Sequence, residues 1–273
     1  MGKRIPSRRW QVVAWGSRGR LGVSSITLKD LPAAQVAQVA GRSVLSVVEW
    51  AEVHAPPGRP EELANAARAA EAAGLQASSY GSYWRAGVSD AGEFVDVVRA
   101  ARAVGTSRIR IWAGAVGSAE ASSQDWAAVI GATREAALIA ADQGCEVAFE
   151  FHGESLTDTV DGTVRLLEEV GSVNLSTYWQ PPVDASVPDA VDGLRRLVDR
   201  VSAVHVFSWW PGTMRLALRE RTDLWSSVFD VLAAHDSSTD LLLEFVPGDD
   251  PDMVVSEAAV LEDLVAAAQG RVA

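Results

Sequence analysis

The chain has 273 residues, of which 48% are hydrophobic and 22% charged, a composition typical of a globular protein with a large core. Its formal net charge of -12 argues against the basic surface that a nucleic-acid-binding or anionic-membrane-binding protein needs. The single cysteine, Cys145, has no partner for an internal disulfide, which indicates a reducing compartment.

The first 20 residues carry six basic residues and no acidic one. The stretch SRRWQVV at residues 7–13 is similar to a twin-arginine export signal, but Arg18 and Arg20 interrupt the apolar segment that such a signal requires. We therefore expect residues 1–20 to be an extension before the fold, and the protein to be cytoplasmic. No stretch of the sequence approaches the roughly 18 apolar residues of a membrane span.

Short β-branched segments alternate with Ala-rich segments of helical period along nearly the whole chain. The expected strands cover residues 21–28, 44–50, 75–80, 108–112, 146–151, 173–179, 201–209 and 241–246. The clearest expected helices cover residues 60–74, 89–105, 125–144, 156–171 and 252–270. Eight strands, each followed by a helix or a helix-sized segment, predict an α/β fold, a (β/α)8 TIM barrel, as a single domain over residues 21–273. A doubly wound open sheet is the alternative, but it usually has a Gly-rich phosphate turn after its first strand, and none is present.

The histidines and tryptophans gather where the expected strands end. His54, His152 and His205 lie at or just beyond the carboxyl ends of strands, and only His235 lies elsewhere. The tryptophans on the same side are Trp50, Trp84, Trp112, Trp179, Trp209 and Trp210. Because TIM-barrel chemistry takes place at the carboxyl ends of the strands, this distribution favours a site there.

Side-chain alternation along three strands points polar groups into the barrel. In VAFEFHGE (residues 147–154), Glu150 and His152 share one face, while the larger apolar residues take the other. The same count turns Glu244 and His205 inward. Two buried carboxylates repel each other unless they are protonated or paired with a cation, and no Lys or Arg lies in these three strands. A divalent metal, Mn2+, Mg2+, Co2+ or Zn2+, would supply the charge. Salt bridges to Arg215 or Arg85 are the alternative.

The ordered motifs VVEWAEVHAPPG, RIRIWAG, VAFEFHGESLTDT, YWQPP, VHVFSWWPG and LLLEFVPGDDP resemble the xylose-isomerase-like TIM-barrel family, in particular members labelled sugar phosphate isomerase/epimerase. The resemblance covers roughly residues 20–265. It implies a divalent metal at the barrel mouth, held by Glu, Asp, His and Glu. Glu150, His205 and Glu244 match this set. Ser176 occupies the place of the Asp, and Gln180, on the same face of that strand, offers an amide oxygen instead.

This resemblance implies a metal-dependent sugar isomerase or epimerase that removes a proton α to a carbonyl and forms an ene-diolate, with Mn2+ as the expected metal. Glu150 and Glu244 would be the acid/base pair, and the metal ligands would be Glu150, Gln180, His205 and Glu244. Further residues expected to contact the carbohydrate are His152, Arg215, Trp112, Trp179, Glu49 and His54. The weak phosphate-binding features favour an unphosphorylated sugar, a keto-sugar or a glycoside.

Two other functions stay open on the sequence. A lyase or deglycosidase acting on a keto-glycoside or keto-inositol would use the same proton abstraction and then expel a leaving group. A non-catalytic sugar-binding barrel would have lost its metal at Ser176. An abasic-site endonuclease shares the fold but needs more metal-binding residues than four histidines provide, together with a basic DNA-binding groove. Barrels of this kind often dimerise, so a homodimer is also open.

Overall fold

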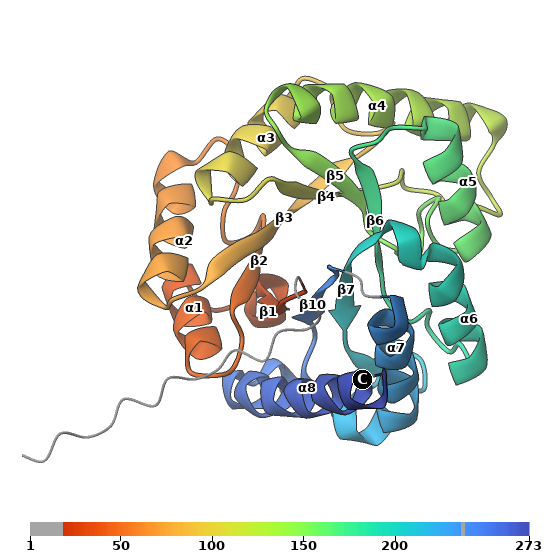
Figure 1. The fold of residues 1–273 in the computed structure, drawn as a ribbon. Coiled ribbons are helices and arrows are strands. Elements are labelled where there is room, and N and C mark those ends of the chain that lie inside the picture. Colours follow the sequence, from red (N-terminus) through yellow and green to blue (C-terminus); the bar gives the residue numbers. More distant parts are fainter. Residues whose placement is uncertain (1–18, 236–237, 273) are drawn as a thin grey trace, which may run out of the picture.

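The computed structural model describes residues 19–235 and 238–272. Within them, eight parallel strands close a barrel in the order β1-β10-β7-β6-β5-β4-β3-β2, and the helices surround it (Figure 1). The barrel strands are β1 (Leu21–Ser24), β2 (Val47–Ala51), β3 (Gln76–Arg85), β4 (Arg108–Trp112), β5 (Glu146–Phe149), β6 (Leu175–Trp179), β7 (Val201–Val206) and β10 (Asp240–Leu243). The predicted TIM barrel is confirmed, while the expected extension lies outside the described residues except for Gly19 and Arg20.

Each strand of the barrel is followed by a helix that packs on its outer face. The helices are α1 (Ala33–Gly41), α2 (Pro60–Ala72), α3 (Glu93–Ala103), α4 (Ser123–Asp142), α5 (Val160–Val170), α6 (Val187–Leu197), α7 (Thr222–His235) and α8 (Pro251–Val272). The clearest expected helices correspond to five of these, α2, α3, α4, α5 and α8. The helix α6 also has a capping signal in the sequence, since Ser186 accepts the backbone N–H of Asp189 and a proline follows at its first turn. No helix in the described ranges is long and apolar enough to cross a membrane.

The expected strand over residues 201–209 is divided in two. β7 leaves the barrel after Val206, and β8 (Ser208–Trp209) pairs antiparallel with β9 (Arg215–Leu216) as a small hairpin. The expected strand over residues 21–28 likewise ends at Ser24, and residues 25–28 form a 3-10 turn. The side chain of Ser25 accepts the backbone N–H of Ala51 there, so the turn ties the ends of β1 and β2 together.

Two apolar layers follow from the alternation of side chains along the strands. One small cluster lies inside the barrel and consists of Val47, Ala148, Tyr178, Ala203 and Leu242. The larger cluster fills the space between strands and helices and includes the opposite faces of the same strands. The inner residues that follow this small cluster toward the carboxyl ends of the strands therefore belong to the barrel mouth.

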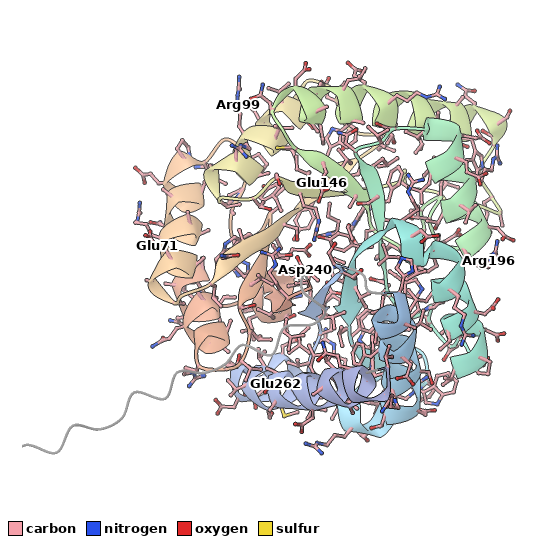
Figure 2. All side chains as sticks on the ribbon, viewed as in Figure 1. Glu71, Arg99, Glu146, Arg196, Asp240 and Glu262 are labelled. Atoms are coloured by element: carbon pink, nitrogen blue, oxygen red, sulfur yellow. The ribbon has the colours of Figure 1, made fainter. Side chains whose placement is uncertain are left out.

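A buried ionic network closes the other end of the barrel. The carboxylate of Asp240, only 1% exposed, accepts hydrogen bonds from Arg20 at 2.7 Å, Arg108 at 3.1 Å and Ser78 at 2.7 Å. Arg108 also pairs with Glu146 at 2.8 Å. Figure 2 labels Asp240 and Glu146. A depression of about 490 Å3 lies beside this network, away from the barrel mouth.

Replacing Asp240 by Asn should lower the free energy of unfolding by about 3 kcal/mol, because Arg108 would lose its buried counter-charge. Chemical denaturation measures the change. Asp230→Asn is the control, since Asp230 pairs with Arg271 on the surface, where such a pair contributes at most about 1 kcal/mol. Equal losses in the two variants would contradict a structural role for the buried network.

Candidate active site at the barrel mouth

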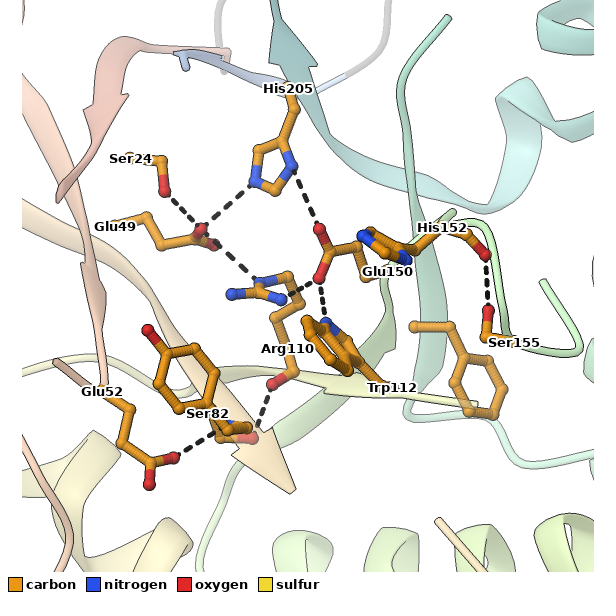
Figure 3. A network of polar contacts seen from close by, with 12 residues as sticks. Ser24, Glu49, Glu52, Ser82, Arg110, Trp112, Glu150, His152, Ser155 and His205 are labelled. Atoms are coloured by element: carbon orange, nitrogen blue, oxygen red, sulfur yellow. Dashed lines mark hydrogen bonds and ion pairs between the residues drawn. The ribbon is translucent and has the colours of Figure 1, made fainter. Parts of the chain in front are cut away.

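Five ionisable side chains meet at the mouth, and all of them are buried. Glu49 lies on β2, Arg110 on β4 and His205 on β7, while Glu150 and Glu244 directly follow β5 and β10. Their exposed fractions run from 0 to 6%. Figure 3 shows four of them, Glu49, Arg110, Glu150 and His205, pointing toward one another from different strands. The sequence predicted the convergence of Glu150, His205 and Glu244, and the structure brings these three together.

His205 lies at the centre of the group, and its two ring nitrogens have different surroundings. Nε2 is 3.2 Å from Oε1 of Glu49. Nδ1 faces three oxygens: Oε1 of Gln180 at 3.2 Å, Oε2 of Glu244 at 3.4 Å and Oε1 of Glu150 at 3.9 Å. With Nε2–H donating to Glu49, Nδ1 would direct a lone pair at these oxygens. A positive group, either a proton or a metal cation, is therefore needed between Nδ1 and the oxygens.

Glu49 is held rigidly below His205. Its two carboxylate oxygens accept hydrogen bonds from Ser24 at 2.9 Å and from Ser79 at 2.8 Å, on the neighbouring strands β1 and β3 (Figure 3 labels Ser24). The side chain is completely buried. The oxygens of Glu49 are occupied by Ser24, Ser79 and His205, so its expected contact with substrate hydroxyls stays a prediction. A carboxylate in this position fixes the orientation of the imidazole.

Arg110 is a further charged residue of the mouth that the sequence analysis does not single out. Its Nη1 donates to Oε2 of Glu150, and its Nε lies 3.6 Å from Oε1 of Glu49. Alternation within RIRIW places Arg108 and Arg110 on one face and the two isoleucines on the other, so the same parity that located Glu150 also predicts an inward Arg110. The carboxylates thus have a cation from a neighbouring strand.

The environment shifts the pKa values of these groups in different directions. Burial alone would raise the pKa of Glu49, but Arg110 and His205 outweigh it and lower that pKa. Burial lowers the pKa of His205, but the carboxylates of Glu244 and Glu49 outweigh burial and raise it to about 9. Burial raises the pKa of Glu244, and the nearby Glu150 carboxylate adds to this rise against the attraction of His205. Glu244 is therefore the carboxyl group that most readily holds a proton.

The predicted metal ligands fit a cation by their donor atoms. Three oxygens lie 3.2 to 3.9 Å from one imidazole nitrogen, and ligands about 2.1 Å from one ion have neighbours at about 3 Å. Among the described residues, however, no three His, Cys, Asp or Glu side chains are arranged to hold a metal ion. One of the oxygens belongs to an amide, and Glu150 turns its other oxygen to Arg110 and Trp112.

Ser176 does not lie at the mouth. It pairs in register with Ala148 of the inner apolar cluster, and its hydroxyl donates to Ser202 at 2.9 Å. The next inward residues of this segment are Tyr178, which packs edge-on to His205, and Gln180, whose amide oxygen faces Nδ1. The mouth position on this strand therefore belongs to Gln180, whereas Ser176, the place of the aspartate by resemblance, lies deeper in the barrel.

Two further residues expected to contact the carbohydrate, Trp179 and His54, are buried in this structure, and their carbohydrate contacts stay predictions. Trp179 is completely buried in the core between strands and helices, because its neighbour Tyr178 takes the inward face of β6. His54 is 9% exposed, and its ring nitrogens lie 3.0 Å from the hydroxyl of Ser25 and 3.0 Å from the carbonyl of Leu31. His54 therefore braces a loop.

The remaining expected contacts lie near the mouth. The indole N–H of Trp112 donates to Glu150, and its ring stacks on His152 with centroids 5.1 Å apart (Figure 3). Arg215 pairs with Asp249 and lies 5.0 Å from the ring centre of Phe245. Carbohydrate contacts by Trp112, His152 and Arg215 stay predictions.

Comparison with known proteins places this geometry in a family. The model of the Xylose isomerase-like TIM barrel family matches residues 40–206, more than half of the chain. The chain belongs to this family. The match includes Glu49, Arg110, Glu150 and His205, whereas Glu244 lies beyond it. No curated protein is similar enough to this xylose isomerase-like barrel to count as a match.

Solved structures share the fold of this xylose isomerase-like barrel at low identity. The probable 3-DHS dehydratase AsbF from Bacillus anthracis is 20% identical, with a TM-score of 0.76, over 89% of this chain and 98% of that one. An L-ribulose 3-epimerase is 16% identical, with a TM-score of 0.72, over 93% and 96%. A xylose isomerase-like TIM barrel protein from Mycobacterium smegmatis, in complex with magnesium, is 11% identical, with a TM-score of 0.69, over 93% and 99%.

The raised pKa of His205 predicts how the stability of the metal-free protein depends on pH. A proton bound more tightly in the folded state stabilises it below pH 6.5, the ordinary value, and this contribution is lost as the pH rises through about 9. The free energy of unfolding should fall by up to about 3 kcal/mol over this range. Denaturant unfolding after chelation measures the fall. It should shrink in His205→Asn and persist in His235→Asn, a histidine far from the mouth; an unchanged fall in His205→Asn would contradict the assignment.

Proposed function

We propose that the protein is a carbohydrate isomerase or epimerase that moves a proton on a carbon next to a carbonyl group. The observation that carries the proposal is the convergence of Glu150 and Glu244 on Nδ1 of His205, where both carboxylates are buried. Enzymes of this fold act at the carboxyl ends of the barrel strands, where these residues lie. The epimerases among the similar structures support the proposal by analogy of fold.

We extend the proposal to a divalent metal, with Mn2+ first and Mg2+, Co2+ or Zn2+ as alternatives. The residues that would hold it are His205 through Nδ1, Glu150 through Oε1, Glu244 through Oε2 and Gln180 through its amide oxygen. When bound, such an ion polarises a carbonyl and stabilises the negative charge that develops on its oxygen. The Mycobacterium smegmatis protein of the same fold was solved in complex with magnesium, which supports a divalent ion as a ligand.

The two carboxylates, Glu150 and Glu244, would have different roles in proton transfer. Glu244, whose pKa is raised by burial, is suited to take and return the proton near neutral pH. Glu150 keeps Oε2 in contact with Arg110 and Trp112, so only its other oxygen faces the reacting region. Return of a proton by Glu244 to the neighbouring carbon would give an isomer. An epimer needs a proton delivered to the same carbon from the opposite side, and Glu150, the second carboxyl group of the pair, would supply it.

A lyase or dehydratase is the second candidate, and aromatic rings beside the site favour it. Phe207 follows His205 by two residues, and Phe245 directly follows Glu244. Trp209 packs between them, with ring centroids 4.7 Å from Phe207 and 5.2 Å from Phe245. Such a wall suits a substrate with a bulky leaving group. The same proton abstraction would then lead to loss of that group.

Loading with Mn2+ followed by gel filtration should leave about one metal ion per chain, measured by elemental analysis. Glu244→Gln and Gln180→Leu should each lower this content, because each removes or weakens one donor. The matched control is Glu257→Gln, a buried glutamate that accepts the backbone N–H of Leu218 away from the mouth. Absence of metal in the wild type would remove the metal from the proposal and favour a binding protein.

In D2O, the wild type should exchange the α-proton of a set of ketopentoses and ketohexoses, detected by NMR. Replacing Glu244 by Gln should slow this exchange by about 100-fold or more, since a general base contributes that much. Exchange with an epimer or isomer as the product supports the first candidate, and release of a fragment supports the lyase. No exchange with any carbonyl sugar or glycoside would contradict both enzyme proposals.

A further inference from the structure

We propose that Arg110 is a positioning residue. It binds Oε2 of Glu150 and thereby orients the other oxygen, Oε1, toward His205. This inference rests on the proposed function of the same site. Oε2 of Glu150 receives both Nη1–H of Arg110 and the indole N–H of Trp112. Oε1 of the same carboxylate faces Nδ1 of His205 at 3.9 Å. The two oxygens of one side chain therefore have separate partners.

Glycine on the neighbouring strand makes room for the guanidinium. Gly81 of β3 pairs in register with Arg110 of β4. A Cβ at residue 81 would lie 2.6 Å from Nη2 of Arg110 and 3.3 Å from its Cζ and Nε. Any other residue at position 81 would push the end of this side chain away. The fold thus contains a space fitted to a guanidinium, which marks Arg110 as a built part of the site.

The same guanidinium also reaches the residue that orients His205. Nε of Arg110 lies 3.6 Å from Oε1 of Glu49, and that oxygen is 3.2 Å from Nε2 of His205. One planar group therefore spans both carboxylates, as Figure 3 shows. A lysine ammonium would keep the charge without the planar guanidinium, which directs Nη1–H at Glu150 while its Nε lies within ion-pair distance of Glu49 without a hydrogen bond. The shape of Arg110, as well as its charge, carries the positioning role.

A positioning role and a purely electrostatic role predict opposite effects on metal binding. If Arg110 only competes as a positive charge for Glu150, its removal frees the carboxylate and tightens the binding of a divalent cation. If Arg110 orients Glu150, its removal lets the carboxylate turn away and weakens binding, by the 10–100-fold typical of partners that orient metal ligands. The sign of the change therefore tests the proposal.

The experiment compares Arg110→Met, Arg110→Lys and Gly81→Ala with the wild type. Gly81→Ala displaces the flexible end of Arg110 and keeps its charge, so it tests position without removing the ion pair from the protein. Gly131→Ala is the control, because a Cβ at this helical position meets nothing within 4 Å. Thermal unfolding checks that each variant is folded. If Arg110→Met does not fold, the other two variants decide.

The first readout is the indole N–H of Trp112 in metal-free protein, assigned by NMR with Trp112→Phe. We expect Gly81→Ala and Arg110→Lys to shift this resonance and speed its exchange with solvent at least 10-fold, because Glu150 loses its fixed place. Gly131→Ala should change neither. An unchanged Trp112 signal in both variants overturns the proposal. This readout needs neither metal nor substrate, so it stands even if the proposed function fails.

The second readout is the affinity for Mn2+ alone, by calorimetry. We expect it to fall about 10–100-fold in Gly81→Ala, Arg110→Lys and Arg110→Met. Tighter binding in Arg110→Met would overturn the positioning role and show a competing charge. If the wild type binds no Mn2+ and exchanges no α-proton, the proposed function fails. The Trp112 signal alone then tests whether Arg110 positions Glu150.

Discussion

Charge compensation inside a narrow barrel is the constraint on which the rest of this site depends. Three carboxylates, Glu49, Glu150 and Glu244, are almost fully buried around one imidazole and one guanidinium. Removing any of these charges from water costs several kcal/mol unless a partner lies in contact. Five of the barrel strands contribute such a charged side chain, on the strand or directly after it, and each has an oppositely charged neighbour once His205 carries a proton.

This compensation also makes the two proposed acid/base residues unequal. Glu150 has two donors on one oxygen, from Arg110 and Trp112. Glu244 has no such donors among the described residues and lies against His205, so burial is the main cause of its raised pKa. Chemically identical side chains thus lie in different surroundings: Glu150 accepts two hydrogen bonds, whereas burial raises the pKa of Glu244. Both carboxylates, Glu150 with its two donors and Glu244 without them, face Nδ1 of His205.

Much of the fold and the centre of the site could be predicted from alternation alone. The parity of EVAFEF, VHVF and LLLE placed Glu150, His205 and Glu244 inward, because strand geometry leaves only two faces. How far along a strand a residue lies is harder to predict than the face it occupies. Ser176 and Gln180 share a face, and only the register with β5 shows which of them reaches the mouth. The position of Trp179 at a strand end favours the mouth, whereas its parity places it in the core outside the barrel. The parity of RIRIW predicts an inward Arg110 in the same way as that of the other three strands.

The pairing of Gly81 with Arg110 has a consequence for how this barrel can change over evolutionary time. A side chain at position 81 and a guanidinium at position 110 exclude each other, because both would occupy the same few cubic ångströms. Neither position can drift alone without disturbing Glu150. Homologous chains that have lost the arginine are free to fill position 81, so the two sites should vary together as one inherited unit across the strands.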